Sequence, residues 1–207
     1  MTTVFQNRTS AVAAWTDLEE RVRSCTRCGL CSSRKNTVFG QGNRNSPVVF
    51  IGEGPGAEEA EQGVAFVGRA GQLLTQILAS VDIRREDVFI MNVVKCRPPE
   101  NRVPTPEEMV ACSPFLETQL ALLSPHIVVC LGNTPTRWLL KTTEGITALR
   151  GRWFPWRGIR LVPMFHPSYL LRNDSKKVGG PKELTWRDIK AVRVEMDRIA
   201  AEGGERS

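Results

Sequence analysis

Short apolar runs alternate with longer segments of mixed polarity along most of the chain. The runs are rich in β-branched residues, which is typical of buried strands, and they lie at 47–52, 87–94, 126–131 and 159–165. Apolar residues at helical spacing predict helices at 11–23, 70–78, 134–140 and 185–201, and another from Thr105 onward. Thr105 and Glu108 are placed to cap the start of that helix, with a proline between them in its first turn. This alternation predicts an α/β fold with a mainly parallel sheet, whose functional groups collect at the carboxyl ends of the strands.

The chain has 207 residues, which is room for one domain of ordinary size. We expect a single domain over 1–207, with its core at about 25–200 and a disordered tail at 202–207. Hydrophobic residues make up 41% of the chain, which is enough for one sizeable core. No stretch approaches the roughly 18 apolar residues of a membrane helix, and residues 1–15 lack the pattern of a signal peptide. We therefore expect a cytoplasmic protein.

The positive charge of the chain is local. The formal net charge is +6, yet residues 1–140 hold equal numbers of basic and acidic side chains, whereas residues 150–190 hold 10 basic and 3 acidic ones. A basic segment on an otherwise neutral protein indicates a surface for a polyanion, and nucleic acid is favoured over a membrane because no amphipathic anchor accompanies it. The alternative at this point is a solvated basic face that serves only solubility.

Six cysteines are present, namely Cys25, Cys28, Cys31, Cys96, Cys112 and Cys130. Thiols in a cytoplasmic protein are more often metal ligands or catalytic groups than disulfides. The first three follow one another at three-residue spacing, so two thiolates can bind one metal from a single turn. The fold would have to bring Cys96 and Cys112 to them, whereas Cys130 lies in an apolar run and is most simply a core residue. Four thiolates suit zinc and an iron–sulfur cluster equally well, so the spacing does not choose the metal.

Four further side chains are candidates for chemistry. Glu53 lies between two glycines directly after a predicted strand, and His166, one of two histidines, follows the last predicted strand within the basic segment. Asn92 lies near the end of an apolar strand, where a buried amide needs partners. Phe66 can stack on a flat ligand. Each has an ordinary alternative, as a surface glutamate, a strand-end asparagine or a core aromatic, so the argument depends on all of them meeting at one edge of the sheet.

These residues lie in four motifs that resemble those of family 4 uracil-DNA glycosylases, the iron–sulfur members of the uracil-DNA glycosylase superfamily. The motifs are GEGPG at 52–56, FVGRAGQLL at 66–74, NVVKCRPP at 92–99 and HPSYLLR at 166–172. The resemblance runs in order from about Cys25 to Arg172. It implies the three-layer α/β/α sandwich of that superfamily. It also implies a [4Fe–4S] cluster bound by Cys25, Cys28, Cys96 and Cys112, with Cys31 as a neighbour.

The resemblance implies an enzyme of base-excision repair, which hydrolyses the N-glycosidic bond of uracil in DNA after flipping the base and leaves an abasic site. The substrate-binding residues implied are Gly54, Gly56, Phe66 and Asn92. Phe66 would stack on the flipped ring and Asn92 would bind its polar edge. His166 would donate a hydrogen bond to uracil O2, and Glu53 would orient the attacking water. Glu58 and Glu59 are nearby carboxylates that could share the role of Glu53.

The motif that begins at His166 also implies how DNA is bound. Leu170, with Tyr169 or Leu171, resembles the apolar wedge that fills the gap left by the extruded nucleotide. The residues expected to bind phosphates are Ser168, Arg172, Lys176 and Lys177. The partner expected is therefore uracil-containing DNA, single- or double-stranded, bound by a monomer that associates with the nucleoid and with no membrane.

Two positions depart from the family pattern. Ala65 replaces the usual proline before Phe66, and Ala60 stands where an acidic residue is common, so base selectivity could differ and extend, for example, to hypoxanthine. A related branch captures its abasic product through a histidine on an inserted basic loop, but residues 95–104 contain no histidine. The remaining alternative is a non-catalytic iron–sulfur module that binds DNA.

Overall fold

A six-stranded sheet forms the centre of the protein, for which a computed structural model describes residues 2–173 and 177–204. The strand order is β1-β3-β2-β4-β6-β5. The strands have these bounds: β1 (Gln41–Gly42), β2 (Val48–Gly52), β3 (Phe89–Asn92), β4 (Ile127–Leu131), β5 (Phe154–Trp156) and β6 (Ile159–Met164). The four predicted strands are β2, β3, β4 and β6, and they pair in parallel, whereas the short edge strands β1 and β5 are antiparallel. The prediction of a mainly parallel sheet is confirmed.

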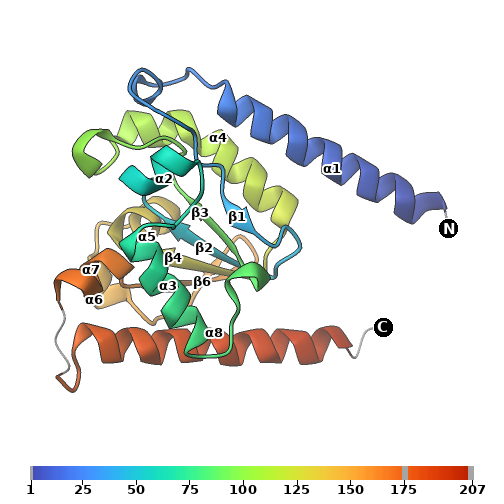
Figure 1. The fold of residues 1–207 in the computed structure, drawn as a ribbon. Coiled ribbons are helices and arrows are strands. Elements are labelled where there is room, and N and C mark those ends of the chain that lie inside the picture. Colours follow the sequence, from blue (N-terminus) through green and yellow to red (C-terminus); the bar gives the residue numbers. More distant parts are fainter. Residues whose placement is uncertain (1, 174–176, 205–207) are drawn as a thin grey trace.

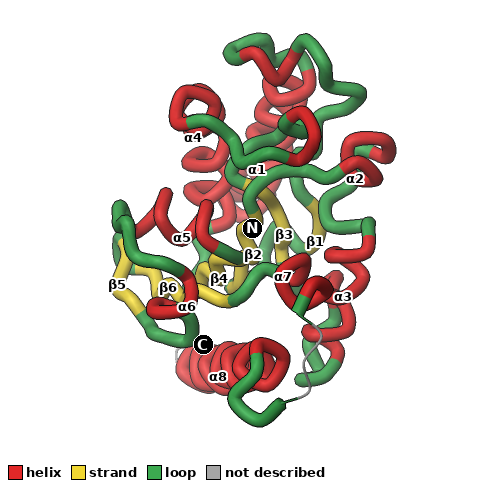
Figure 2. The backbone as a smooth tube through the Cα atoms, turned by 90° about the vertical axis from the view of Figure 1, so that its left-hand side faces the viewer, coloured by secondary structure: helices red, strands yellow, loops and turns green. Residues whose placement is uncertain are grey.

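Helices cover both faces of this sheet (Figure 1). The helices have these bounds: α1 (Thr2–Arg23), α2 (Ala57–Gln62), α3 (Arg69–Ala79), α4 (Pro106–Leu123), α5 (Asn133–Leu140), α6 (Ile146–Leu149), α7 (Pro167–Arg172) and α8 (Pro181–Gly204). Three short 3₁₀ turns add to them, at Gly29–Cys31, Arg85–Asp87 and Pro99–Asn101. Figure 2 shows α8 on one side of the sheet and α1 with α4 on the other.

The side chains of each strand divide between two cores because neighbours in a strand point to opposite faces. Along β2, Val49 and Ile51 pack with α1, α4 and α5, while Val48 and Phe50 pack with α3 and α8. All four strand residues are fully buried. Each core lies between the sheet and one helical layer, so removing that layer would expose the core to solvent. The structure is therefore the three-layer α/β/α sandwich that the resemblance implied.

The predicted start of α4 is confirmed in detail. Glu108 N donates to Thr105 Oγ1 at 3.3 Å, and Thr105 N donates to Glu108 Oε2 at 2.8 Å, which is a reciprocal capping box. Arg102 adds a bidentate ion pair to the same carboxylate and lowers the pKa of Glu108. The helix continues through Pro114 and carries Cys112 in its second turn.

The helices at the two ends of the sequence are longer than the hydrophobic pattern predicts. α1 begins at Thr2 rather than near residue 11. α8 ends at Gly204 and not at 201, so it includes residues 202–204 of the expected disordered tail, while 205–207 lie outside the described residues. Both extensions are rich in polar residues, so apolar spacing gave no signal for them.

Candidate active site and cysteine cavity

Polar groups of the four parallel strands meet at the carboxyl edge of the sheet. Gly52 and Asn92 are direct partners in the pairing of β2 with β3. Gly132 follows β4, and its amide donates to the last residue of β6, Met164, at 2.9 Å. His166 comes two residues after that strand. The structure thus brings together residues that are more than 100 positions apart in the sequence, as the topology predicted.

Asn92 and Phe66 meet above Gly52. A Cβ atom on residue 52 would lie 2.4 Å from Asn92 Oδ1 and 2.5 Å from Phe66 Cζ, so only glycine leaves room for both groups. Asn92 is buried, and its Oδ1 has no hydrogen-bond partner. A buried acceptor without a partner costs about 1–3 kcal/mol, which a ligand with an N–H donor would recover.

The turn that carries Phe66 is held in a rare backbone conformation. Phe66 has φ of 51°, in the left-handed region that bulky residues seldom adopt. Glu59 fixes the turn because its Oε1 accepts from the amides of Val67 at 3.0 Å and Gly68 at 2.9 Å. Gly71 packs so tightly that a Cβ there would lie 1.8 Å from the carbonyl oxygen of Phe66. These contacts give Glu59 a role in shaping the turn.

Arg85 supports the same turn from the opposite side. Its Nη2 donates to the carbonyl oxygen of Ala65 at 2.5 Å, and burial lowers the pKa of its guanidinium. Ala65 is fully buried. Ala65 stands where the family usually has proline. The turn is nevertheless held in place, because Glu59 and Arg85 hydrogen-bond its backbone.

His166 lies beside Phe66, with ring centroids 5.8 Å apart. It is the N-cap of α7, and its Nδ1 accepts from the amide of Ser168 at 3.1 Å. Because that amide can only donate, Nδ1 must be unprotonated, which places the proton of the neutral ring on Nε2. Burial lowers the pKa of His166 to about 4, with a smaller contribution from the positive charge of Arg172. The ring is therefore a neutral donor at pH 7.

Glu53 follows β2 and is hydrogen-bonded by Thr134, which lies in the first turn of α5. Thr134 was not singled out by the sequence, and its position two residues after Gly132 at a strand end was the available signal. Gly132 has φ of 92°, and a Cβ there would lie 3.1 Å from Cβ of His166. The turn 132–134 therefore contacts both His166 and Glu53.

The remaining glycines of the first motif pack against protein groups. A Cβ on Gly54 would lie 2.9 Å from Cγ2 of Val94, and one on Gly56 would lie 2.6 Å from Oε2 of Glu59. Both glycines therefore allow close packing of the loop after β2. The structure shows why glycine is needed at both positions. Contact of Gly54 and Gly56 with the substrate stays a prediction.

The apolar residues of the expected wedge differ in exposure. Leu170 is only 2% exposed, since the six-residue helix α7 turns its side chain inward, whereas Leu171 is 39% exposed. The ring of Tyr169 packs on Phe165 at a centroid distance of 5.0 Å. Leu171 is thus the exposed apolar side chain of this motif, and the wedge stays a prediction.

The residues expected to bind phosphates lie in different settings. Ser168 Oγ lies 2.8 Å from Nδ1 of His166, so its side chain contacts the active site. Arg172 ends α7 and is exposed. Lys177 follows α7 in the chain, and Lys176 lies outside the described residues.

Much of the basic segment at 150–190 is paired with acidic side chains. Arg150 forms a buried ion pair with Asp188, and Arg160 pairs with Glu195, which lies beyond the segment. Arg187 pairs with Glu183 on the same helix. Acidic side chains of α8 therefore offset the charge of these three arginines.

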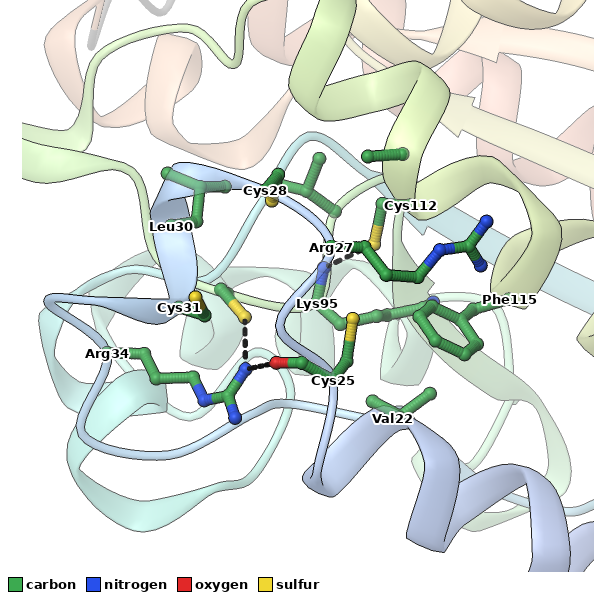
Figure 3. A pocket seen from close by; sticks show the side chains of 13 residues that line it. Val22, Cys25, Arg27, Cys28, Leu30, Cys31, Arg34, Lys95, Cys112 and Phe115 are labelled. Carbon is green, nitrogen blue, oxygen red and sulfur yellow. Dashed lines mark hydrogen bonds between the residues drawn. The ribbon is translucent and has the colours of Figure 1, made fainter.

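A second site lies between the amino-terminal segment and the start of α4 (Figure 3). Five of the six cysteines line one cavity there: Cys25, Cys28, Cys31, Cys96 and Cys112. Arg34 donates to the carbonyl oxygen of Cys25 and lies 3.8 Å from Sγ of Cys96, while the amide of Lys95 donates to Sγ of Cys112 at 3.3 Å. The sixth cysteine, Cys130, is buried in β4, as expected.

The chemistry of this cavity fits a cluster bound by thiolates. Burial raises the pKa of Cys96 to about 11 and also raises that of Cys112, so both thiols must lose a proton on binding metal. Arg34 and the Lys95 amide face the sulfur atoms and would stabilise their negative charge. Within 2–173 and 177–204, no three His, Cys, Asp or Glu side chains are close enough to hold a single metal ion.

The two sites are joined by a buried lysine. Lys95 is 1% exposed, and its Nζ donates to the carbonyl oxygen of Asn92 at 2.8 Å, while its amide contacts Cys112 in the cysteine cavity. Burial lowers the pKa of Lys95 to about 8.

In the described part of the chain, no helix is long and apolar enough to cross a membrane.

The fold and the site define a class of protein: an α/β/α sandwich in which a buried amide, an aromatic ring and a histidine meet at the carboxyl edge of the parallel strands. The sequence model of the uracil DNA glycosylase superfamily matches residues 39–190. The Type-4 uracil-DNA glycosylase of Thermotoga maritima is 50% identical over 178 residues, which cover 85% of this chain and 91% of that protein. The Type-4 enzyme of Archaeoglobus fulgidus is 38% identical over 83% of this chain and 96% of its own length.

A more distant relative is the Type-5 uracil-DNA glycosylase of Pyrobaculum aerophilum, which is 30% identical over 77% of this chain and 85% of its own length. This chain belongs to the uracil DNA glycosylase superfamily, and within it to the type-4 family.

Proposed function

We propose that this protein hydrolyses the N-glycosidic bond between uracil and deoxyribose in DNA, the first step of base-excision repair. The observation that carries the proposal is the meeting of Asn92, Phe66 and His166 at one strand edge, with a buried acceptor on Asn92 that lacks a partner. Type-4 relatives at 50% and 38% identity support the same activity.

Base recognition follows from the side chain of Asn92. Its free Oδ1 would accept from N3–H of uracil, and its amide nitrogen would donate to O4. Cytosine presents an acceptor at N3 and a donor at the exocyclic position, so both contacts would be lost in a buried setting. Phe66 would stack on the ring and complete the pocket.

Bond cleavage depends on charge that develops in the transition state. The sugar becomes cation-like while negative charge grows on the departing uracil. His166 would donate from Nε2 to uracil O2, and a donor of this kind contributes about 3 kcal/mol. Glu53, facing the sugar side, would stabilise the cation and orient the attacking water.

DNA binding would use the exposed end of α7. We assign the wedge to Leu171, the exposed apolar residue beside Leu170, and phosphate contacts to Arg172, Lys177 and Lys176, with Ser168 contributing through its hydrogen bonds to His166. The protein would act on single- or double-stranded DNA as a monomer, in the cytoplasm and on the DNA of the nucleoid.

The cysteine cavity would bind a [4Fe–4S] cluster through Cys25, Cys28, Cys96 and Cys112, with Cys31 as a neighbour. Such a cluster would supply a crosslink between chain segments. The four ligands would tie the end of α1 to the loop after β3 and to α4. Lys95 would then hold Asn92 at a fixed distance from this crosslink.

The activity is tested with labelled oligonucleotides that carry uracil opposite guanine, opposite adenine or in a single strand, together with a hypoxanthine substrate. We expect uracil release that drops at least 100-fold in Glu53→Ala and in His166→Ala. Glu61→Ala and His126→Ala are matched controls outside the site and should retain full activity. Binding of DNA without release of any base would support instead a non-catalytic DNA-binding module, and hypoxanthine release would indicate a broader selectivity.

The cluster is tested separately by iron content and visible absorbance. Cys25→Ser and Cys96→Ser should each lose most of the iron, whereas Cys31→Ser should retain it. Retention of iron in Cys25→Ser or Cys96→Ser would contradict the ligand assignment. Loss of iron in Cys31→Ser would show that Cys31 is a ligand in place of one of the four.

A further inference from the structure

We infer that Thr134 is a positioning residue that fixes the carboxylate of Glu53 for catalysis. Its Oγ1 donates to Oε2 of Glu53, across 81 positions of the sequence. The inference rests on the proposed role of Glu53 and assigns to the turn after β4 a part in the reaction.

The hydrogen bond of Thr134 differs from those of other threonines in the described helices. Five of them donate to the backbone carbonyl four residues earlier, which is the ordinary local contact: Thr16, Thr75, Thr118, Thr136 and Thr185. Thr134 instead donates to a carboxylate in the loop that follows β2. A long-range bond of this kind is set by the tertiary fold.

The turn that carries Thr134 is itself fixed. Gly132 N donates to the carbonyl oxygen of Met164 at 2.9 Å, and its own carbonyl accepts from Thr136 Oγ1 at 2.7 Å. Its φ of 92° and its contact with Cβ of His166 leave no space for a side chain. Thr134 therefore projects from a rigid turn that also abuts the second proposed catalytic residue.

The carboxylate of Glu53, by contrast, needs an external anchor. Glu53 is flanked by Gly52 and Gly54 and is half-buried. Among the residues that the structure describes, Thr134 is the side chain that hydrogen-bonds it. With Oε2 held, Oε1 stays available for the attacking water. Loss of the hydroxyl would let the carboxylate rotate away from the sugar, which lowers kcat and leaves DNA binding unchanged.

The test compares Thr134→Val, which keeps the shape and removes the hydroxyl, with Thr134→Ser, which keeps the hydroxyl. Single-turnover rates and KM are measured on single-stranded uracil DNA, with Thr118→Val as a control on a remote helix. We expect Thr134→Val to lower kcat by about 10- to 100-fold, the equivalent of one hydrogen bond to a charged group. KM should stay within about twofold, and Thr134→Ser should recover most of the rate.

The same substitutions are repeated in the Glu53→Ala background, where Thr134→Val should have no further effect. An equal loss in both backgrounds, or a full rate in Thr134→Val, would overturn the inference. If Thr134→Val does not fold, as judged by its thermal midpoint, Thr134→Ala against Thr134→Ser makes the same comparison. Full activity of Glu53→Ala itself would refute the proposed role of Glu53, which is a failure distinct from that of Thr134.

Discussion

The low pKa of His166 makes the free energy of unfolding depend on pH in the acid range. Burial lowers its pKa to about 4 from the ordinary 6.5, so the unfolded chain binds a proton at a pH where the folded chain does not. His166 therefore favours the folded state above about pH 6.5, and that contribution is lost as the pH falls toward 4. Replacing it with glutamine, which has no titrating group, removes this dependence.

The size of the effect follows from the two pKa values. Between pH 7.5 and pH 4.5, the free energy of unfolding of the wild type should fall by about 2–3 kcal/mol through this group alone. His166→Gln should lack that part of the decline. All other titrating groups, and the cysteine cavity, are common to both proteins and cancel in the comparison.

The measurement is urea unfolding of both proteins at the two pH values. A second readout is the proton NMR titration of the His126→Gln variant, in which His166 is the remaining histidine. A midpoint near 4 is expected. A midpoint near 6.5, or equal pH dependence of stability in wild type and His166→Gln, would refute a buried neutral imidazole and with it the role of a neutral donor.

Two further predictions concern the pocket and the DNA surface. Gly71→Ala should lower uracil release at least 100-fold, because a methyl group there overlaps the carbonyl of Phe66, and circular dichroism should show that the fold is retained; normal activity would contradict the assigned role of the turn. Arg172→Gln should weaken DNA binding and reduce by about one the slope of its salt dependence in a fluorescence anisotropy titration. Arg187→Gln is the matched control, since Arg187 is paired with Glu183, and an equal effect in both variants would show that charge in this region acts without regard to position.

The parts of the fold that could be predicted from sequence are those fixed by local chemistry. The β-branched runs predicted the four parallel strands, and Thr105 with Glu108 predicted the start of α4, because a cap needs only neighbouring residues. The edge strands β1 and β5 contain two and three residues and are too short for a periodic pattern.

The residues of the site that follow directly from the ends of the strands could be predicted from the sequence. Parallel topology brings Glu53, Asn92 and His166 to one edge, so their positions in the sequence sufficed. The pairing of Thr134 with Glu53 depends on the path of a turn, and the choice between Leu170 and Leu171 depends on how a short helix packs. The strand end at Gly132 indicated where Thr134 lies but not its pairing with Glu53, and the exposure of Leu171 in place of Leu170 has no local signal.

The left-handed turn at Phe66 has a consequence for changing base preference. Glu59, Arg85 and Gly71 each contact the backbone of the turn, so moving the turn to admit a larger base would disrupt these contacts. An engineer who seeks a pocket for purines would have to redesign residues 59–71 together with Arg85 as a unit. For the same reason, a single substitution of Phe66 should more readily abolish base release than change which base is released.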